Sequence, residues 1–261
     1  MIIICMMIAF LSCIIGSVCG IGGGIIIKPL MDAMGMYNVV TINFMSCCTV
    51  LGMSAWNVGK TLINKEASID FRKTTYLAFG AAVGGMSGKR LFAYISSFFA
   101  ESDMVGGIQA GILLVATFAT FLYTLEKDNI QSRHVKNSFV CVAMGFCLGN
   151  FGAFLGIGGG PFNIALLYHF FSMTSKMAAQ NSLYIIVFSQ TLSFVETLIS
   201  EKLDLDISVL LLMMLGGILG SEFGGWINKK ISEVFTTKLF LGIMIIIMLL
   251  NTYNIIKFLR G

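Results

Sequence analysis

Two glycine runs of identical pattern are the most distinctive chemical feature of this 261-residue sequence. Unwound glycine backbone exposes amide N–H groups, and a helix that starts after it adds the positive end of its dipole. Such a segment binds an anion without a buried charge. The alternative is that these glycines only allow helices to pack closely. The glycines predicted to bind substrate are Gly20, Gly22, Gly23, Gly24, Gly156, Gly158, Gly159 and Gly160.

Six polar side chains within apolar stretches complete the predicted substrate-binding site. They are Lys28, Asn43, Ser46, Gln180, Asn181 and Ser182. A lysine at membrane depth is costly, so Lys28 either neutralises a bound anion, pairs with another group or extends to the interface. Neutral donors suit an anion that must be released again. The alternative for them is hydrogen bonding between helices.

Other polar residues in apolar stretches give weaker signals. Glu196 and Glu222 could carry coupling protons, or they could pair with basic side chains near a membrane surface. His169 has no metal-ligand partner one helical turn away, so no metal site is predicted. The sequence lacks the residue patterns of hydrolases, metalloproteases and nucleotide-binding proteins. No catalytic residue and no cofactor are therefore predicted.

The composition places these residues in a lipid bilayer. Hydrophobic residues make up 57% of the chain and charged residues only 11%, against about 25% charged in soluble domains. The net charge of +4 is too small and too scattered to indicate nucleic-acid binding. The seven cysteines lie in apolar stretches and contain no CxxC pair, so we interpret them as small apolar residues. The first residues lack a basic region and a cleavage site, which favours mature protein over a signal peptide.

Eight apolar blocks are long enough, or nearly so, to cross a membrane. They are Ile2–Leu30, Val39–Ile63, Thr75–Gly88, Met104–Leu125, Ser138–Phe171, Met177–Ile199, Ile207–Ile227 and Phe235–Phe258. The first and fifth are too long for one ordinary helix, and the glycine runs interrupt both. The third is closed by Lys89 and Arg90, although it could begin near Asp70.

An internal repeat relates the two halves of the chain. A shift of 136 residues aligns the glycine runs, Ser46 with Ser182, and Gly80, Gly84 and Gly88 with Gly216, Gly220 and Gly224. The two glycine triplets have the spacing of helix-packing faces. We predict an all-α polytopic membrane protein with two repeats of about four segments each. Residues 1–125 form the first repeat, 126–137 a polar linker and 138–261 the second repeat.

The paired motifs resemble those of the TauE/SafE family of sulfite-exporter-like permeases. The motif GIGGG-x4-P at Gly20–Pro29 and its copy GIGGG-P at Gly156–Pro161 carry the resemblance, together with the serine about 22 residues after each run. The resemblance implies export or uptake of small anions such as sulfur oxyanions, sulfonates or organic acids. Pro161 directly follows its glycines whereas Pro29 does not, so we expect the two half-sites to differ chemically.

Gly-interrupted segments at matching positions of two repeats indicate a transporter binding site. We therefore predict a secondary transporter of small anions in the cell membrane, using alternating access and a coupling ion, H⁺ or Na⁺. The alternatives are an anion channel and a membrane assembly subunit without transport of its own.

The membrane orientation depends on the glycine-broken blocks. If each crosses the membrane, the 17 Lys and Arg residues divide ten to seven between the two sides. If each turns back, they divide eleven to six, with both termini on the less basic side. The positive-inside rule favours the second arrangement.

Overall fold

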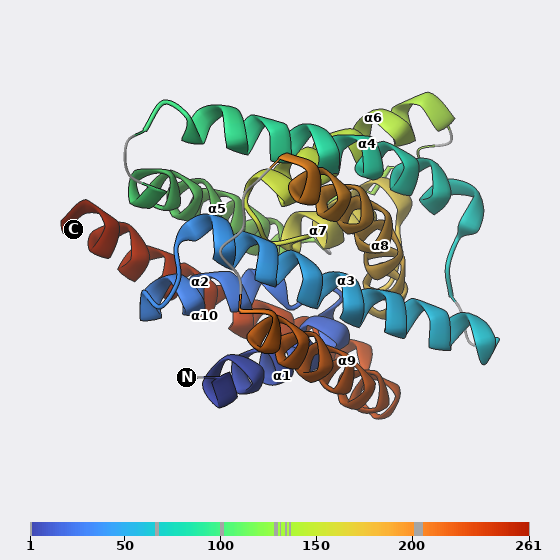
Figure 1. The fold of residues 1–261 in the computed structure, drawn as a ribbon. Helices are drawn as coiled ribbons and strands as arrows, with labels where there is room; N and C mark the ends of the chain where they lie inside the picture. The colour runs from blue at the N-terminus through green and yellow to red at the C-terminus, as the bar shows by residue number, and fades with distance from the viewer. Residues whose placement is uncertain are drawn as a thin grey trace.

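The computed structural model describes residues 2–65, 68–99, 102–127, 130, 132, 133, 135, 137–200 and 206–260. Within these ranges the chain forms ten α-helices and no strand (Figure 1). The helices are α1 (Ile2–Cys19), α2 (Gly24–Met34), α3 (Val39–Ile63), α4 (Phe71–Ser96), α5 (Ser102–Glu126), α6 (Ser138–Phe154), α7 (Pro161–Phe171), α8 (Ser175–Ser200), α9 (Ile207–Lys230) and α10 (Glu233–Arg260). Residues 201–205 and parts of the predicted linker 126–137 lie outside the described ranges.

The eight predicted blocks correspond to these ten helices because the first and fifth blocks each form two. The third block is longer than predicted. Helix α4 begins after Asp70, whose side chain accepts a hydrogen bond from the backbone N–H of Lys73, and it continues to Ser96. The prediction that Lys89 and Arg90 close this block was wrong. Both lie within the helix, Lys89 buried in protein and Arg90 paired with Glu196.

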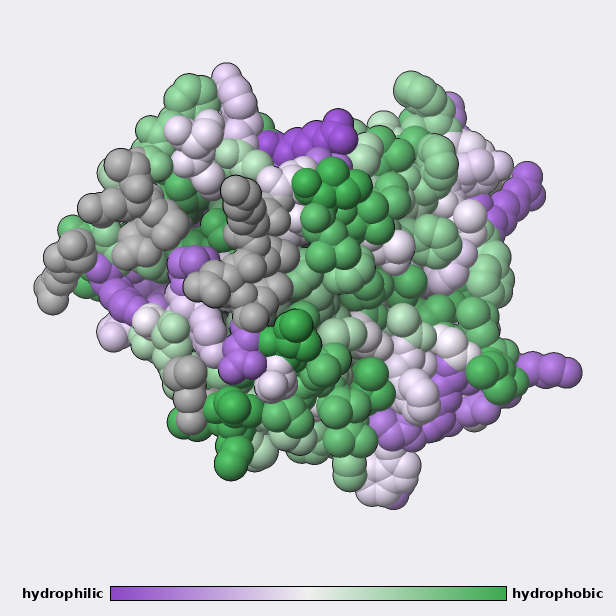
Figure 2. Space-filling model, in the orientation of Figure 1, coloured by the Kyte–Doolittle hydropathy of each residue, from purple (hydrophilic) through white to green (hydrophobic). Residues whose placement is uncertain are grey.

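The chain is an integral, multi-pass membrane protein. Six of the described helices, α1, α3, α5, α8, α9 and α10, are long and apolar enough to cross a bilayer. Apolar side chains cover most of the visible face in Figure 2, and hydrophilic side chains gather toward its edges. Helix α4 has sufficient length but carries four basic residues, Arg72, Lys73, Lys89 and Arg90, so it is the least apolar of the long helices.

Both glycine-broken segments make a sharp turn within the protein. Gly20 and Gly22 have φ of 72° and 73°, values that suit glycine because it lacks a Cβ atom. After this turn, Gly23 packs against Cys13, one to two turns back on α1. The second segment turns in the same way at Gly156 and Gly158, with φ of 69° and 77°. Figure 1 shows the N- and C-termini at the same end of the molecule.

The most extensive helix packing joins the two halves of the chain. Helix α4 packs on α6, and α9 packs on α1. The predicted glycine triplets form these contacts, because a Cβ atom added at Gly84 would collide with the Phe146 carbonyl and one added at Gly220 with the Phe10 carbonyl. The triplets are therefore packing faces, as predicted.

The helix pairs follow a symmetric pattern. The pairs α4–α6, α4–α8 and α2–α10 become α9–α1, α9–α3 and α7–α5 when the equivalent helices of the two halves are exchanged, and each of these is present. The pairs α3–α8 and α5–α10 are unchanged by the exchange. Two repeats related by a two-fold axis would give this packing. The common origin of the two halves stays a prediction.

We predict that Gly84→Ala destabilises the protein by about 1–3 kcal/mol, because the added methyl group forces α4 and α6 apart. The matched control is Gly242→Ala on α10, where an added Cβ atom meets nothing within 4 Å. The control should leave the protein as stable as before or slightly more stable, because alanine favours the helix. Thermal unfolding in detergent measures both. Equal stability of the two variants would contradict the packing role of Gly84.

A second prediction concerns topology. If α6 and α7 turn back, Lys127 after α5 and Thr174 before α8 face the same side of the membrane. Single cysteines at these positions, in a background lacking the exposed Cys147, should react with an impermeant maleimide from the same side. A cysteine at Asn38 should react from the other side. Labelling of positions 127 and 174 from opposite sides would mean that α6 and α7 form one crossing.

Candidate substrate-binding site

The two glycine breaks meet inside the protein. All ten residues of the two runs are buried. A Cβ atom added at Gly24 would collide with the Ile157 carbonyl of the other run and would lie 2.8 Å from Ser46 Oγ. Gly22 and Gly158 both face Val50. The first helices after the breaks, α2 and α7, therefore start from one shared region.

Helices α3 and α8 flank this region from opposite halves. Val50 of α3 touches both breaks, and Ile186 of α8 faces Gly22 and Gly159. The two flanks differ at one equivalent position, because Gly156 packs against Asn43 whereas Gly20 packs against Ala179. The amide of Asn43 thus has no counterpart in the other half. This supports the expectation that the two half-sites differ chemically.

Several side chains beside the breaks are buried without a hydrogen-bond partner among the described residues. They are both amide atoms of Asn43, Ser46 Oγ, Asn163 Oδ1 and Gln190 Nε2, on residues no more than 2% exposed. The Gln190 amide lies against Gly158, which places it at the second break. Buried polar groups are normally paired, and leaving one unpaired costs about 1–3 kcal/mol. This group of side chains, which we call the central polar cluster, is therefore suited to a polar ligand.

The backbone adds donors to the central polar cluster. Within the described residues, the N–H groups of Gly22, Gly24, Gly159 and Gly160 make no backbone hydrogen bond. The last three lie at the start of α2 or α7, where helix N–H groups lack an internal acceptor. Both helices, eleven residues long, direct their positive dipole ends to the region of the breaks.

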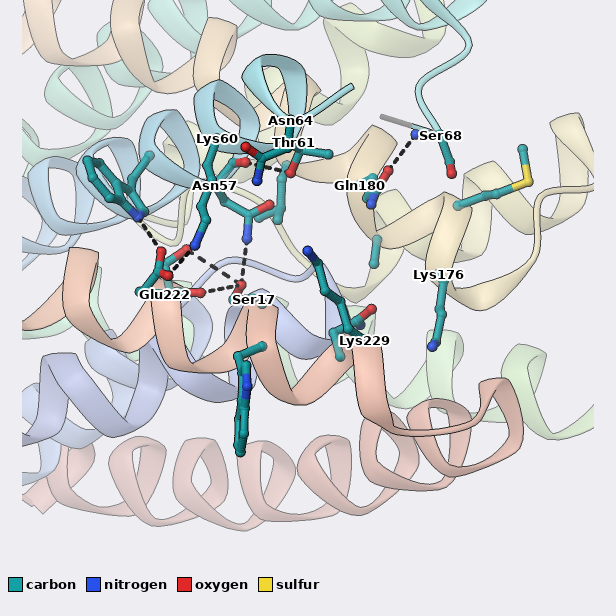
Figure 3. A pocket seen from close by; sticks show the side chains of 18 of the residues that line it. Ser17, Asn57, Lys60, Thr61, Asn64, Ser68, Lys176, Gln180, Glu222 and Lys229 are labelled. Carbon is teal, nitrogen blue, oxygen red and sulfur yellow. Dashed lines mark hydrogen bonds and ion pairs between the residues drawn. The ribbon is translucent and has the colours of Figure 1, made fainter. Parts of the chain in front are cut away.

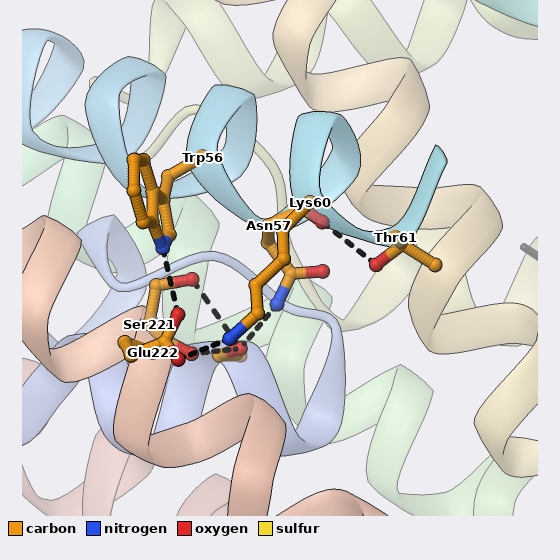
Figure 4. Close-up of polar contacts among 7 residues, drawn as sticks. Trp56, Asn57, Lys60, Thr61, Ser221 and Glu222 are labelled. Atoms are coloured by element: carbon orange, nitrogen blue, oxygen red, sulfur yellow. Dashed lines mark hydrogen bonds and ion pairs between the residues drawn. The ribbon is translucent and has the colours of Figure 1, made fainter. Parts of the chain in front are cut away.

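A cavity of about 520 Å³ leads from one end of the molecule toward the first break. Its walls come from the last turns of α3 and α9 and the first turns of α8 (Figure 3). Ala179 lines the cavity and also contacts Gly20 of the first break. At the wall, Glu222 accepts hydrogen bonds from Lys60 and from Trp56 Nε1, the latter at 2.9 Å (Figure 4).

A smaller cavity, of about 120 Å³, lies at the other end of α8, between the last turns of α4 and α8. Arg90 donates to both oxygens of Glu196, at 2.8 and 3.2 Å. The two ion pairs occupy related places, because Lys60 and Glu196 are equivalent under the 136-residue shift. Each pair links a helix of one half to a helix of the other.

The predicted site residues separate into those at the breaks and those elsewhere. Asn43 and Ser46 join the glycines, and Ser182 accepts a long hydrogen bond of 3.5 Å from Asn163. Asn181 instead ties the segment before α4 to α8, donating to the Ser68 carbonyl and accepting from Thr74 Oγ1. Gln180 lines the larger cavity and accepts from the Ser68 N–H at 2.7 Å.

Lys28 forms an ion pair that the sequence analysis did not include. It is 2% exposed and donates to Asp32 Oδ2 at 3.0 Å, one turn along α2. The carboxylate neutralises its charge. The prediction that Lys28 pairs with another group is confirmed; its contact with substrate remains a proposal.

The two intramembrane glutamates also have partners. Glu196 pairs with Arg90 and Glu222 with Lys60, which confirms the alternative in which they pair with basic side chains. His169 packs against Tyr123 and Phe170 through ring contacts. The described residues contain no group of three or more side chains able to hold a metal ion.

Asn163 and Gln190 were missed from the sequence. Under the repeat shift, Asn163 corresponds to Ile27 and Gln190 to Ser54, so neither is a repeated residue. The signal that the sequence offered for each was a polar residue within an apolar block. In the structure, Gln190 lies seven residues, or two helical turns, after Leu183 on α8, and Leu183 lines the larger cavity.

Comparisons with known proteins find similarity along nearly the whole chain. The family described as "Sulfite exporter TauE/SafE" matches residues 5–251. The "Probable membrane transporter protein YunE" of Bacillus subtilis (strain 168) is 24% identical over 270 residues, covering 95% of this chain and 94% of the relative. No solved structure matches the chain.

We predict that Lys28→Met lowers stability by about 3–5 kcal/mol, because it leaves the Asp32 carboxylate buried and unpaired. The double variant Lys28→Met with Asp32→Leu should recover most of this loss, since an apolar pair removes both buried charges. Thermal unfolding measures both effects. If the well-folded double variant also loses transport, Lys28 contacts substrate as the sequence suggested; retained transport would contradict that role.

Proposed function

The chain belongs to the TauE/SafE sulfite exporter family, and we propose that it is a secondary transporter of small anions, such as sulfite, a sulfonate or another organic anion. It is a membrane transporter of this family. The observation that carries the proposal is the central polar cluster, in which buried amide and hydroxyl groups without partners surround two unwound glycine segments.

The chemistry of the cluster favours an anion. The amide groups of Asn43 and Gln190, the hydroxyl of Ser46 and the backbone N–H groups of the breaks are donors directed into one buried region. The dipoles of α2 and α7 add positive potential without a formal charge. Half-helices that begin at unwound segments near the membrane midplane bind anionic groups in this way in other transporters.

The difference between the two ends supports alternating access. The larger cavity reaches toward the centre from the Lys60–Glu222 end, whereas the cavity at the Arg90–Glu196 end is smaller. If the equivalent helices of the two halves exchanged their arrangements, the larger cavity would form at the Arg90–Glu196 end instead. The central polar cluster would then be exposed to each side of the membrane in turn. A coupling ion, H⁺ or Na⁺, would supply the driving force for accumulation against a gradient.

Binding is tested by thermal unfolding of the purified protein with sulfite, sulfate, thiosulfate, sulfoacetate and common carboxylates. A ligand at a hundredfold excess over its Kd stabilises the folded state by about 2.7 kcal/mol. We predict that Asn43→Ala weakens binding of the stabilising anion about 3- to 10-fold, which corresponds to one lost hydrogen bond. The ligand-free stability should not fall, because the Asn43 amide has no partner to lose.

The matched control is Asn251→Ala on α10. Asn251 is equally buried but donates to the Ile247 carbonyl of its own helix, so its loss should not change anion affinity. Uptake into proteoliposomes then distinguishes the mechanisms. Accumulation against a gradient driven by H⁺ or Na⁺ supports a secondary transporter, purely downhill flux indicates a channel, and absence of both binding and flux with every anion contradicts the proposal.

A further inference from the structure

Lys89 is a buried cation without a counter-charge among the described residues. It lies on α4 and is 3% exposed. The other buried lysine, Lys28, pairs with Asp32, and the adjacent Arg90 pairs with Glu196. An unpaired charge in a protein interior or at membrane depth is strongly unfavourable, and such residues are retained for function.

The face of α4 that carries Lys89 is directed toward α8. Gly85 precedes Lys89 by one turn, and a Cβ atom added at Gly85 would lie 2.6 Å from the Ser189 carbonyl and 2.8 Å from Ser193 Oγ. Residues four apart share a helix face. Lys89 also lines the smaller cavity together with Thr197 and Glu196 of α8, and Glu196 is paired there with Arg90. Lys89 therefore lies between α4 and α8, at the end of the protein that holds the smaller cavity.

The inner side of this position reaches the central polar cluster. Gly85, one turn before Lys89 on α4, faces Ser189 of α8, and Gln190 follows Ser189 along that helix. The Gln190 carbonyl accepts a hydrogen bond from the Cys47 thiol at 3.8 Å, and Gln190 borders Gly158 of the second break. Ser189 Oγ, 2% exposed, has no hydrogen-bond partner among the described residues. Lys89 and two unpartnered groups of α8, Ser189 and Gln190, thus follow one another from the smaller cavity toward the breaks.

We propose that Lys89 supplies the positive charge that an anion meets as it passes between the central polar cluster and the Arg90–Glu196 end. The inference rests on the proposed anion transport and adds the residue that distinguishes substrates by charge. The side chains of the cluster are neutral amides and a hydroxyl, so Lys89 is the group that favours a divalent oxyanion over a monovalent one of similar shape. Lys89 has no counterpart in the other half, where the equivalent residue is Gly225.

The first test is the stability of the ligand-free protein. Lys89→Met should leave the unfolding temperature unchanged or raise it, because it removes a buried charge that has no partner. Lys28→Met is expected to have the opposite effect, because loss of Lys28 leaves the Asp32 carboxylate buried without its partner. A loss of stability as large as that of Lys28→Met would reveal an acidic partner of Lys89 and overturn the proposal.

The second test compares two anions on the purified, full-length protein. Sulfite at alkaline pH is mainly divalent, and methanesulfonate is monovalent. Lys89→Met should weaken sulfite binding about 10- to 100-fold, the range for a lost hydrogen bond to a charged group, and should weaken methanesulfonate binding less. Lys89→Arg, which keeps the charge, should recover most of the sulfite affinity.

The matched control is Lys73→Met, the same substitution on the same helix at a half-exposed lysine paired with Asp70. It should bind both anions as the wild type does. If the wild type binds sulfite and Lys89→Met binds it equally well, the role of Lys89 is wrong while the proposed function stands. If the wild type neither binds nor transports any anion tested, the proposed function fails and this inference fails with it.

Discussion

The rest of the structure depends on one constraint: unwound backbone inside a membrane needs protein or water around its polar groups. The chain meets it by bringing two unwound segments together and enclosing them between α3 and α8. Each break shields the other from lipid, so neither would be stable alone at that depth. The same contact creates a region rich in N–H donors. The proposed binding site and the arrangement that shields the unwound backbone from lipid are thus the same.

Close backbone packing holds this arrangement in place. Helices α4 and α6, and likewise α1 and α9, approach so closely that glycine faces touch backbone carbonyls. Van der Waals packing of this kind is a main source of helix association in lipid, where apolar burial gives little driving force. Because these pairs join the two halves, the helix movements of the proposed alternating access would occur at other surfaces. The ends of the α3–α9 and α4–α8 contacts, which carry the Lys60–Glu222 and Arg90–Glu196 ion pairs, are where we propose that helices separate.

Much of the fold could be predicted from the sequence, and particular residues show why the rest could not. The spacing of the glycine runs and triplets is visible in the sequence. Both breaks and both packing faces lie where that spacing predicts them. The Lys28–Asp32 pair could also have been predicted, since residues four apart on a helix share a face. Gln190 and Asn163 could not be identified, because only the three-dimensional packing shows that Gln190 Nε2 and Asn163 Oδ1 lack hydrogen-bond partners among the described residues. Lys89 was predicted to close the third apolar block, because the sequence alone does not show that α6 and α8 cover that part of α4.

The composition of α4 has a consequence for how the protein is made. This helix, with four basic residues and three packing glycines, is too polar to prefer lipid by itself. Its covering helices, α6 and α8, are synthesised more than 40 residues after it ends. During translation α4 therefore emerges before the helices that cover it. The packing around α4 can be completed only after α8 has been synthesised, when most of the chain has left the ribosome.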